Sequence, residues 1–175
     1  MKILCFGYRA WALAIYENIR EIRNIEVSVI EEKSLVTLNF IETENPDLIL
    51  FYGWSWKIEN EILLRYKCLM LHPSDLPQYR GGSPIQNQIL NGVKISAVSI
   101  FRMANEMDAG PILKKAPLML TGDIDDIFDR LTIIGTSLTI EIVTRYPEEV
   151  LQNSAEATNF PRRLPYMSEI TTADL

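Results

Sequence analysis

The chain has 175 residues, 47% of them hydrophobic and 23% charged, and a formal net charge of −6 at pH 7. This length predicts one globular domain with a core, and the acidic balance argues against nucleic-acid binding, which requires clustered positive charge. Two cysteines are too few for a disulfide scaffold, and a single histidine makes a metal site improbable. No apolar stretch approaches the 18 residues of a membrane span, and the start does not resemble a signal peptide, so we expect a cytoplasmic protein.

Strands and helices alternate through the first 72 residues. Short apolar runs predict buried strands, and apolar residues at helical spacing predict amphipathic helices between them. The expected strands are 3–6, 25–30, 47–52 and 67–71, and the expected helices are about 10–23, 35–44 and 58–65. This alternation predicts an α/β fold with a Rossmann-like, doubly wound, mostly parallel sheet. The first strand-to-helix turn lacks G-x-G-x-x-G, so a dinucleotide cofactor is not supported.

The second half predicts a different arrangement. A helix is expected from Pro84 to Leu90, followed by strands at 95–103 and 112–119. The loop between these strands has no room for a crossover helix, so we expect them to be antiparallel. A long helix at about 123–145 should follow, with Asp123 near its cap. The tail after it is polar and irregular.

The only histidine stands where chemistry is expected. His72 ends the strand predicted at 67–71 and precedes a loop with three prolines and two glycines. Open α/β sheets place ligands at the carboxyl ends of their strands, so His72 is a candidate general base, general acid or oxyanion stabiliser. The alternative is a surface or capping histidine. Asp108 lies in Asp-Ala-Gly-Pro, which is a turn signal and also a candidate partner that orients His72.

Aromatic and basic residues provide candidate walls for a binding site. Trp54 and Trp56 follow a strand end, where they could either face a planar ligand or only pack in the core. Arg80 and the pair Arg162 and Arg163 could clamp phosphate or carboxylate groups, although solvated surface arginines are more common.

Two further groups are weaker candidates. Tyr8, Arg9 and Trp11 occupy the first strand-to-helix turn, which faces the site in this fold class. Ser74 and Asp75 follow His72 directly and either contact substrate or hydrogen-bond only the loop backbone.

Three segments together resemble the folate-dependent formyltransferase family. They are His72-Pro73-Ser74-Asp75-Leu76-Pro77, the run from Tyr79 to Asn87, and Met107-Asp108-Ala109-Gly110-Pro111-Ile112. They are similar to the family's HPSLLP…RG…P and LDAGP segments, in the same order and at about the same spacing, and the resemblance covers about residues 1–170. Residues 1–150 would then form the formyltransferase catalytic core, and 151–175 a tail of the same domain.

Details of these segments most resemble the sugar N-formyltransferase branch. They are the Asp-Leu-Pro and Arg-Gly-Gly-Ser-Pro variants, Gly-Trp-Ser-Trp at 53–56, and Pro-Arg-Arg-x-Pro at 161–165. The resemblance implies transfer of a formyl group from N10-formyltetrahydrofolate to the amino group of a nucleotide-linked deoxyamino sugar, for surface glycan biosynthesis. A UDP-linked 4-amino-4,6-dideoxy sugar of the pseudaminic-acid type is one candidate.

The resemblance also assigns roles to residues. His72 and Asp108 would be catalytic, with protonated His72 stabilising the oxyanion that develops on the formyl group. The expected folate-binding residues are Gly53, Trp54, Ser55, Trp56 and Met107. The expected substrate-binding residues are Tyr8, Arg9, Trp11, Ser74, Asp75, Arg80, Gly81, Gly82 and Gln86.

One position departs from the family pattern. The family places an asparagine two residues before the histidine, and this chain has Met70 there. Loss of one oxyanion donor typically costs roughly 2.7–4 kcal/mol of transition-state stabilisation. Another donor, a backbone N–H or a water must replace it, or catalysis is weak. Sugar formyltransferase-like sequences of the pseudaminic-acid type look similar in lacking this asparagine.

Other functions stay open. Glycinamide ribonucleotide and methionyl-tRNA are alternative amines, although a methionyl-tRNA formyltransferase would be expected to have a further carboxyl-terminal domain. A non-catalytic folate- or nucleotide-binding module and a hydrolase that deformylates the folate are alternatives of other classes. The tail 151–175 is a candidate contact for a second subunit, which would make the protein a homodimer.

Overall fold

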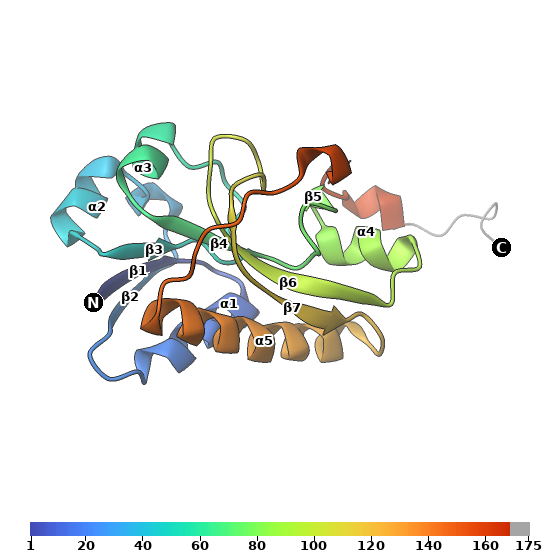
Figure 1. Cartoon of the computed structure of the whole chain (residues 1–175), viewed down its shortest axis with the longest axis horizontal. Helices are drawn as coiled ribbons and strands as arrows, with labels where there is room; N and C mark the ends of the chain where they lie inside the picture. Colours follow the sequence, from blue (N-terminus) through green and yellow to red (C-terminus); the bar gives the residue numbers. More distant parts are fainter. Residues whose placement is uncertain (169–175) are drawn as a thin grey trace.

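A six-stranded sheet forms the centre of the computed structural model, which describes residues 1–168 (Figure 1). Its strand order is β2-β1-β3-β4-β6-β7. The strands are β1 (Lys2–Phe6), β2 (Glu26–Ile30), β3 (Leu48–Leu50), β4 (Cys68–His72), β6 (Ile95–Arg102) and β7 (Ile112–Met119). The first four are parallel, while β6 is antiparallel to both β4 and β7. The predicted fold class, including the antiparallel pair in the second half, is confirmed.

Helices cover both faces of this sheet, as expected for a doubly wound fold. In Figure 1, α1 (Ala10–Arg20) and α5 (Ile124–Thr144) lie on one face, and α2 (Leu38–Glu44) and α3 (Asn60–Arg65) lie on the other. The buried side chains form two clusters accordingly. Along β1, Ile3 and Cys5 belong to the first cluster and Leu4 and Phe6 to the second, because successive strand residues point to opposite faces.

Helix bounds differ from the predicted ones where local caps decide them. The segment expected as one helix at 35–44 is a 3₁₀ turn (Lys33–Leu35) followed by α2. Thr37 separates the two, and its hydroxyl accepts a hydrogen bond from the backbone N–H of Phe40 at 3.2 Å. An N-cap of this kind fixes where a helix begins. In contrast, α4 spans Pro84–Leu90, as predicted.

The tail contacts its own chain through a small second sheet. β8 (Asn159–Phe160) pairs in parallel with β5 (Arg80–Gly81), in the loop that follows β4. Val150 also bridges Ile112 at the start of β7. The described part of the tail therefore packs on the domain itself, and the expected contact of this tail with a second subunit stays a prediction. Residues 169–175 lie outside the described part of the chain.

Both cysteines are free and buried, as their apolar surroundings predicted. Burial raises the pKa of the Cys68 thiol to about 12, so it is protonated at neutral pH and a poor nucleophile. Among the helices of residues 1–168, none is long and apolar enough to cross a membrane.

The amino-terminal cap of α5 gives a prediction for stability. The Asp123 carboxylate accepts from the backbone N–H of Asp126 at 2.9 Å, and the Asp126 carboxylate accepts from the N–H of Asp123 at 3.2 Å. Replacing Asp123 with alanine should lower the free energy of unfolding by about 1 kcal/mol, measured by urea denaturation. Ser137→Ala, at an exposed site within α5, is the control and should leave stability within about 0.5 kcal/mol. An equal change in both variants would contradict the capping role.

Candidate active site

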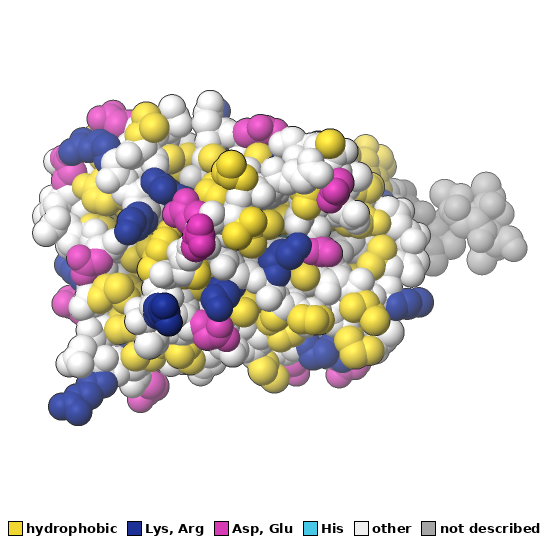
Figure 2. Space-filling model, viewed as in Figure 1, with side chains coloured by type: hydrophobic (Ala, Val, Ile, Leu, Met, Phe, Trp, Pro, Cys, Tyr) yellow, Lys and Arg dark blue, Asp and Glu magenta, His cyan; other side chains and the backbone are white. Residues whose placement is uncertain are grey.

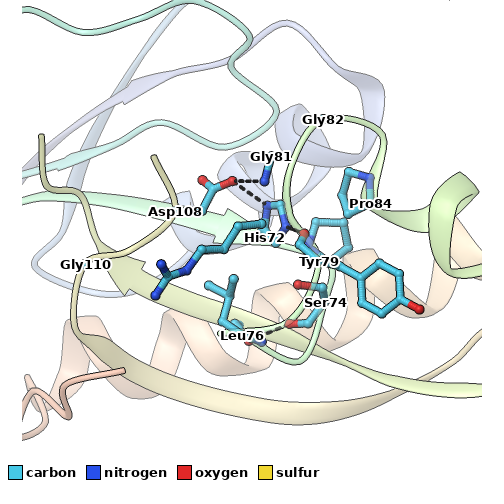
Figure 3. Close-up of polar contacts among 12 residues, drawn as sticks. His72, Ser74, Leu76, Tyr79, Gly81, Gly82, Pro84, Asp108 and Gly110 are labelled. Atoms are coloured by element: carbon cyan, nitrogen blue, oxygen red, sulfur yellow. Dashed lines mark hydrogen bonds and ion pairs between the residues drawn. The ribbon is translucent and has the colours of Figure 1, made fainter. Parts of the chain in front are cut away.

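His72 and Asp108 meet at the carboxyl end of β4 (Figure 3). His72 is the last residue of β4, and Asp108 lies in the loop that joins β6 to β7. Because β6 runs beside β4, this loop returns to the end of β4 and brings the carboxylate to the imidazole. His72 Nδ1 and Asp108 Oδ2 are 3.6 Å apart, and both side chains are at least 90% buried. This distance allows an ion pair but is too long for a direct hydrogen bond.

The other ring nitrogen has a fixed partner. His72 Nε2 lies 2.7 Å from the backbone oxygen of Tyr79. A carbonyl oxygen can only accept, so Nε2 must hold a proton, and a neutral ring then has its lone pair on Nδ1. Nε2 is therefore engaged with the protein and Nδ1 is the nitrogen available for chemistry. The role expected for protonated His72, stabilising the oxyanion on the formyl group, stays a prediction, and Nδ1 is the ring nitrogen from which it would act.

Backbone geometry also fixes the carboxylate. Asp108 Oδ2 accepts a hydrogen bond from the N–H of Gly81 at 2.8 Å. Asp108 itself has φ of 53°, in the left-handed region that aspartate tolerates better than most residues. Non-glycine residues in such conformations are found where surrounding contacts hold them, often at functional sites.

A cleft of about 1550 Å³ opens beside this pair. Its volume exceeds the roughly 300–1,000 Å³ that is typical of pockets for a single small molecule. The predicted site residues that line it are Arg9, Trp11, Gly53, Trp54, Ser55, Trp56, His72, Gly81, Gly82, Gln86, Met107 and Asp108. These residues come from the start of α1, the loop after β3, the end of β4 and the loop that follows it, α4, and the β6–β7 loop. The fold thus brings together most of the positions that the sequence proposed separately.

Tyr8 and Ser74 do not line the cleft. The Tyr8 hydroxyl donates to Ser55 Oγ at 2.6 Å, and its ring packs on those of Trp54 and Trp56. Ser74 is fully buried and donates to the backbone oxygen of Gln78 at 2.7 Å. Both residues therefore support loops of the site, and for Ser74 this is the alternative of hydrogen bonding to the loop backbone. Their contact with substrate stays a prediction.

Asp75 and Arg80 also lie outside the cleft lining. Asp75 is exposed and forms an ion pair with Lys115 of β7. Arg80 is 1% exposed, and its Nε and Nη2 both donate to Gln152 Oε1, at 3.1 and 2.8 Å. The expectation that Arg80 clamps a substrate anion does not agree with this burial, because its guanidinium is used inside the protein.

Four cations line the cleft without a carboxylate partner. They are Arg9, Lys57, Arg162 and Arg163, and within residues 1–168 none of them has a carboxylate oxygen within 4.0 Å. Arg162 Nη2 donates instead to Ser55 Oγ at 3.0 Å. On the face of the molecule drawn in Figure 2, basic and acidic side chains are interspersed. Asp108, Asp125 and Asp129 also line the cleft, so an anionic ligand would bind on the side of the four cations.

Sequence reasoning missed one wall of the cleft and one internal contact. The first half of α5 contributes Asp125, Phe128, Asp129 and Thr132 to the lining. Their helical spacing shows that they share a face, but only the packing of α5 places that face at the cleft. Gln152 was missed because nothing in its polar surroundings distinguishes it from a solvated residue. Within residues 1–168, no three His, Cys, Asp or Glu side chains are grouped to hold a metal ion.

A family model described as formyl transferase matches residues 22–143, well over half of the chain. The chain belongs to the formyl transferase family. Among curated members, it is similar to a methionyl-tRNA formyltransferase of Borrelia garinii subsp. bavariensis, with 40% identity over 129 residues, which cover 70% of this chain and 41% of that protein. A methionyl-tRNA formyltransferase of Borreliella burgdorferi is 35% identical over 146 residues, covering 79% of this chain and 46% of that protein. The chain spans less than half the length of these relatives.

Solved structures of formyl transferases show the same fold. A methionyl-tRNA formyltransferase from Clostridium thermocellum has a TM-score of 0.90 and 34% identity, covering 98% of this chain and 77% of that one. The formyltransferase PseJ from Anoxybacillus kamchatkensis, solved with UDP-4,6-dideoxy-4-formamido-L-AltNAc and tetrahydrofolate, has a TM-score of 0.74 and 22% identity, covering 92% and 86%. At that identity the likeness concerns the fold alone. The family resemblance is confirmed, whereas the sugar branch is not specifically supported.

Proposed function

We propose that this chain transfers a formyl group from N10-formyltetrahydrofolate to a primary amine. The observation that carries the proposal is the His72–Asp108 pair at the edge of a cleft large enough for two substrates. Membership of the formyl transferase family supports the reaction class. A single buried histidine facing a carboxylate provides the acid–base group that amine formylation requires.

The cleft residues fit a folate co-substrate. Trp54 and Trp56 stand at 4.8 Å between ring centroids and offer apolar surface for planar pterin and benzoyl rings. Trp56 is 38% exposed, whereas Trp54 is 7% exposed and its buried indole Nε1 has no hydrogen-bond partner within the described residues, so Trp56 presents most of this wall. We infer that the loop 53–56 and Met107 bind the folate.

The reaction needs one proton to move from the amine to the leaving nitrogen. The folate supplies the formyl group on N10 when it is bound. We infer that neutral His72 accepts the amine proton at Nδ1 as the new C–N bond forms, and returns it to N10 as the old C–N bond breaks, so no other reactant is required. Asp108 stabilises the imidazolium between these steps from 3.6 Å, while Tyr79 holds Nε2.

Methionyl-tRNA is the acceptor that the relatives suggest first. Curated relatives similar to this chain are methionyl-tRNA formyltransferases, at 40% and 35% identity. The expectation of a protein without nucleic-acid partners therefore stays untested, and tRNA belongs among the acceptors to be tried. The unpaired cations at the cleft are compatible with the phosphates next to an aminoacyl ester.

A nucleotide-linked amino sugar is the second candidate. The two segments that resemble the sugar branch, 53–56 and 161–165, meet in the cleft through the hydrogen bond from Arg162 to Ser55. This contact places a guanidinium beside the aromatic wall, where a diphosphate could bind.

The test is to incubate the chain with N10-formyltetrahydrofolate and each acceptor, and to detect the formylated amine by mass spectrometry and tetrahydrofolate by absorbance. Absence of product with every amine, while the folate still binds, would favour a non-catalytic binding module.

Met70 gives a prediction for the reaction rate. It lies two residues before His72 on β4, so the two side chains share a face of the strand, and both line the cleft. Met70→Asn is expected to raise kcat about tenfold, less than the 10²–10³ that a fully positioned oxyanion donor provides. Met70→Leu, which keeps an apolar side chain, should show no increase. A large loss in Met70→Asn alone would mean that an apolar side chain is needed there for packing.

A further inference from the structure

One side chain from the tail connects a buried arginine to the backbone of Asp108. Gln152 Oε1 accepts from Nε and Nη2 of Arg80, at 3.1 and 2.8 Å. Gln152 Nε2 donates to the backbone oxygens of Asp108 and Gly110, at 2.8 and 2.7 Å. Every polar atom of the Gln152 amide is therefore used inside the protein, although the residue lies in a polar tail.

The chemistry of its partners fixes how this amide is oriented. A guanidinium only donates and a carbonyl only accepts, so the oxygen of Gln152 must face Arg80 and its nitrogen must face the β6–β7 loop. Arg80 is 1% exposed, and its other contact is Glu106 at 3.5 Å, whose side chain is 77% exposed. The amide of Gln152 is thus the main buried acceptor for this charge.

These contacts bear on the residue that pairs with His72. Asp108 has φ of 53°, a conformation that a non-glycine residue keeps only where its surroundings hold it. The two bonds from Gln152 hold the carbonyls of residues 108 and 110, on either side of Ala109. At the side-chain end, the N–H of Gly81 holds Oδ2.

The rest of the tail supports the same pair from the His72 side. Thr158 and Phe160 bind the loop after β4, through Tyr79 N–H to Thr158 Oγ1 at 2.8 Å and Gly82 N–H to Phe160 O at 2.9 Å. That loop provides both the Tyr79 oxygen that holds His72 Nε2 and the Gly81 N–H that holds Asp108. The tail therefore supports both hydrogen-bond partners of the pair.

We propose that Gln152 is a positioning residue for formyl transfer, which sets the Asp108 carboxylate against His72 Nδ1 by holding the backbone of residues 108–110. The inference rests on the proposed function, since it concerns the rate of that reaction. Gln152 does not line the cleft, so it contacts neither substrate. Its loss should lower kcat and leave KM for the folate and for the amine within about twofold.

The sharpest variant is Gln152→Glu, which keeps the length of the side chain and an oxygen for Arg80. Its second oxygen would face the two carbonyl oxygens in place of a donor and would repel the loop. We expect kcat to fall roughly 100-fold, the effect of displacing a catalytic group by about 1 Å. The matched control is Asn153→Asp, which makes the same change of charge one residue away at an exposed site and should keep normal kcat. Gln152→Ala adds no charge and should also lower kcat. It serves as the test variant if Gln152→Glu proves unstable to heat.

A double-mutant cycle separates positioning from a general structural role. If Gln152 acts through the Asp108 carboxylate, Gln152→Glu should change kcat less than threefold in a chain that already has Asp108→Asn. Fully multiplicative losses would overturn the inference, and so would normal kcat in both Gln152 variants. Failure of the unchanged protein to formylate any amine would instead overturn the proposed function together with the inference that rests on it.

Discussion

Replacing His72 with asparagine is expected to lower kcat about 10²- to 10⁴-fold, the usual contribution of a general acid–base group. The side-chain amide of asparagine extends only as far as Nδ1 and does not reach the Tyr79 oxygen, which His72 Nε2 approaches at 2.7 Å. Tyr79 keeps its other contact, from its backbone N–H to Thr158 Oγ1 at 2.8 Å, which holds the loop after β4. The amide has no basic nitrogen to replace Nδ1, and the amine proton loses its acceptor. Product formation under single-turnover conditions measures this step separately from product release.

Binding and folding provide the controls for this variant. The chain contains no second histidine, so no other imidazole can substitute for the missing one. Affinity for tetrahydrofolate, measured by calorimetry, should change less than threefold, because the aromatic wall at 53–56 is untouched. The urea midpoint should fall modestly, because the Tyr79 oxygen loses its donor, and it measures this loss separately from the loss of turnover. Normal turnover in His72→Asn would refute the assignment of His72, whatever acceptor is used.

The position of His72 could be predicted because local signals determine it. An apolar run ends there, and prolines and glycines follow, so a strand end and a shaped loop are visible in the sequence. The approach of Asp108 could not be derived from those signals. It depends on β6 pairing beside β4, with Ser99 opposite His72, and strand order is set by tertiary contacts between segments distant in sequence.

The tail shows a different limit of sequence reasoning. β8 has two residues, too few for a periodic pattern, and its pairing with β5 depends on backbone groups that every residue has. Arg80 illustrates the consequence, since an arginine that binds an anion and one that is buried against Gln152 look the same in sequence. The sequence therefore indicated that the loop after β4 belongs to the site, but not that Arg80 of this loop is bound inside the protein by Gln152.

Gly110→Ala is expected to have the largest effect on stability among single methyl additions in the active-site loops. A Cβ at Gly110 would lie 1.8 Å from the backbone oxygen of Arg102, closer than at any other glycine of the described chain. The φ of Gly110 is not in the left-handed region, so alanine is compatible with the local backbone and the effect is purely steric. Arg102 also donates its N–H to the Pro111 oxygen at 2.9 Å, which leaves the two strands little freedom to separate.

Two measurements should change together in this variant. The free energy of unfolding should fall by about 3 kcal/mol, at the upper end of the usual cost of overpacking, as measured by urea denaturation. Moving the loop also displaces Asp108, two residues earlier, so kcat should fall roughly 100-fold.

The control is Gly92→Ala, where φ is +73° and no atom lies within 4 Å of the added Cβ. Its free energy of unfolding should fall by only about 1–2 kcal/mol, the cost of a left-handed conformation for a residue with a Cβ. Its kcat should stay normal, because the added methyl group meets no other atom. If Gly110→Ala lost stability but kept full turnover, Asp108 would not depend on the loop backbone, and the pairing with His72 would have to be maintained by the Gly81 N–H alone.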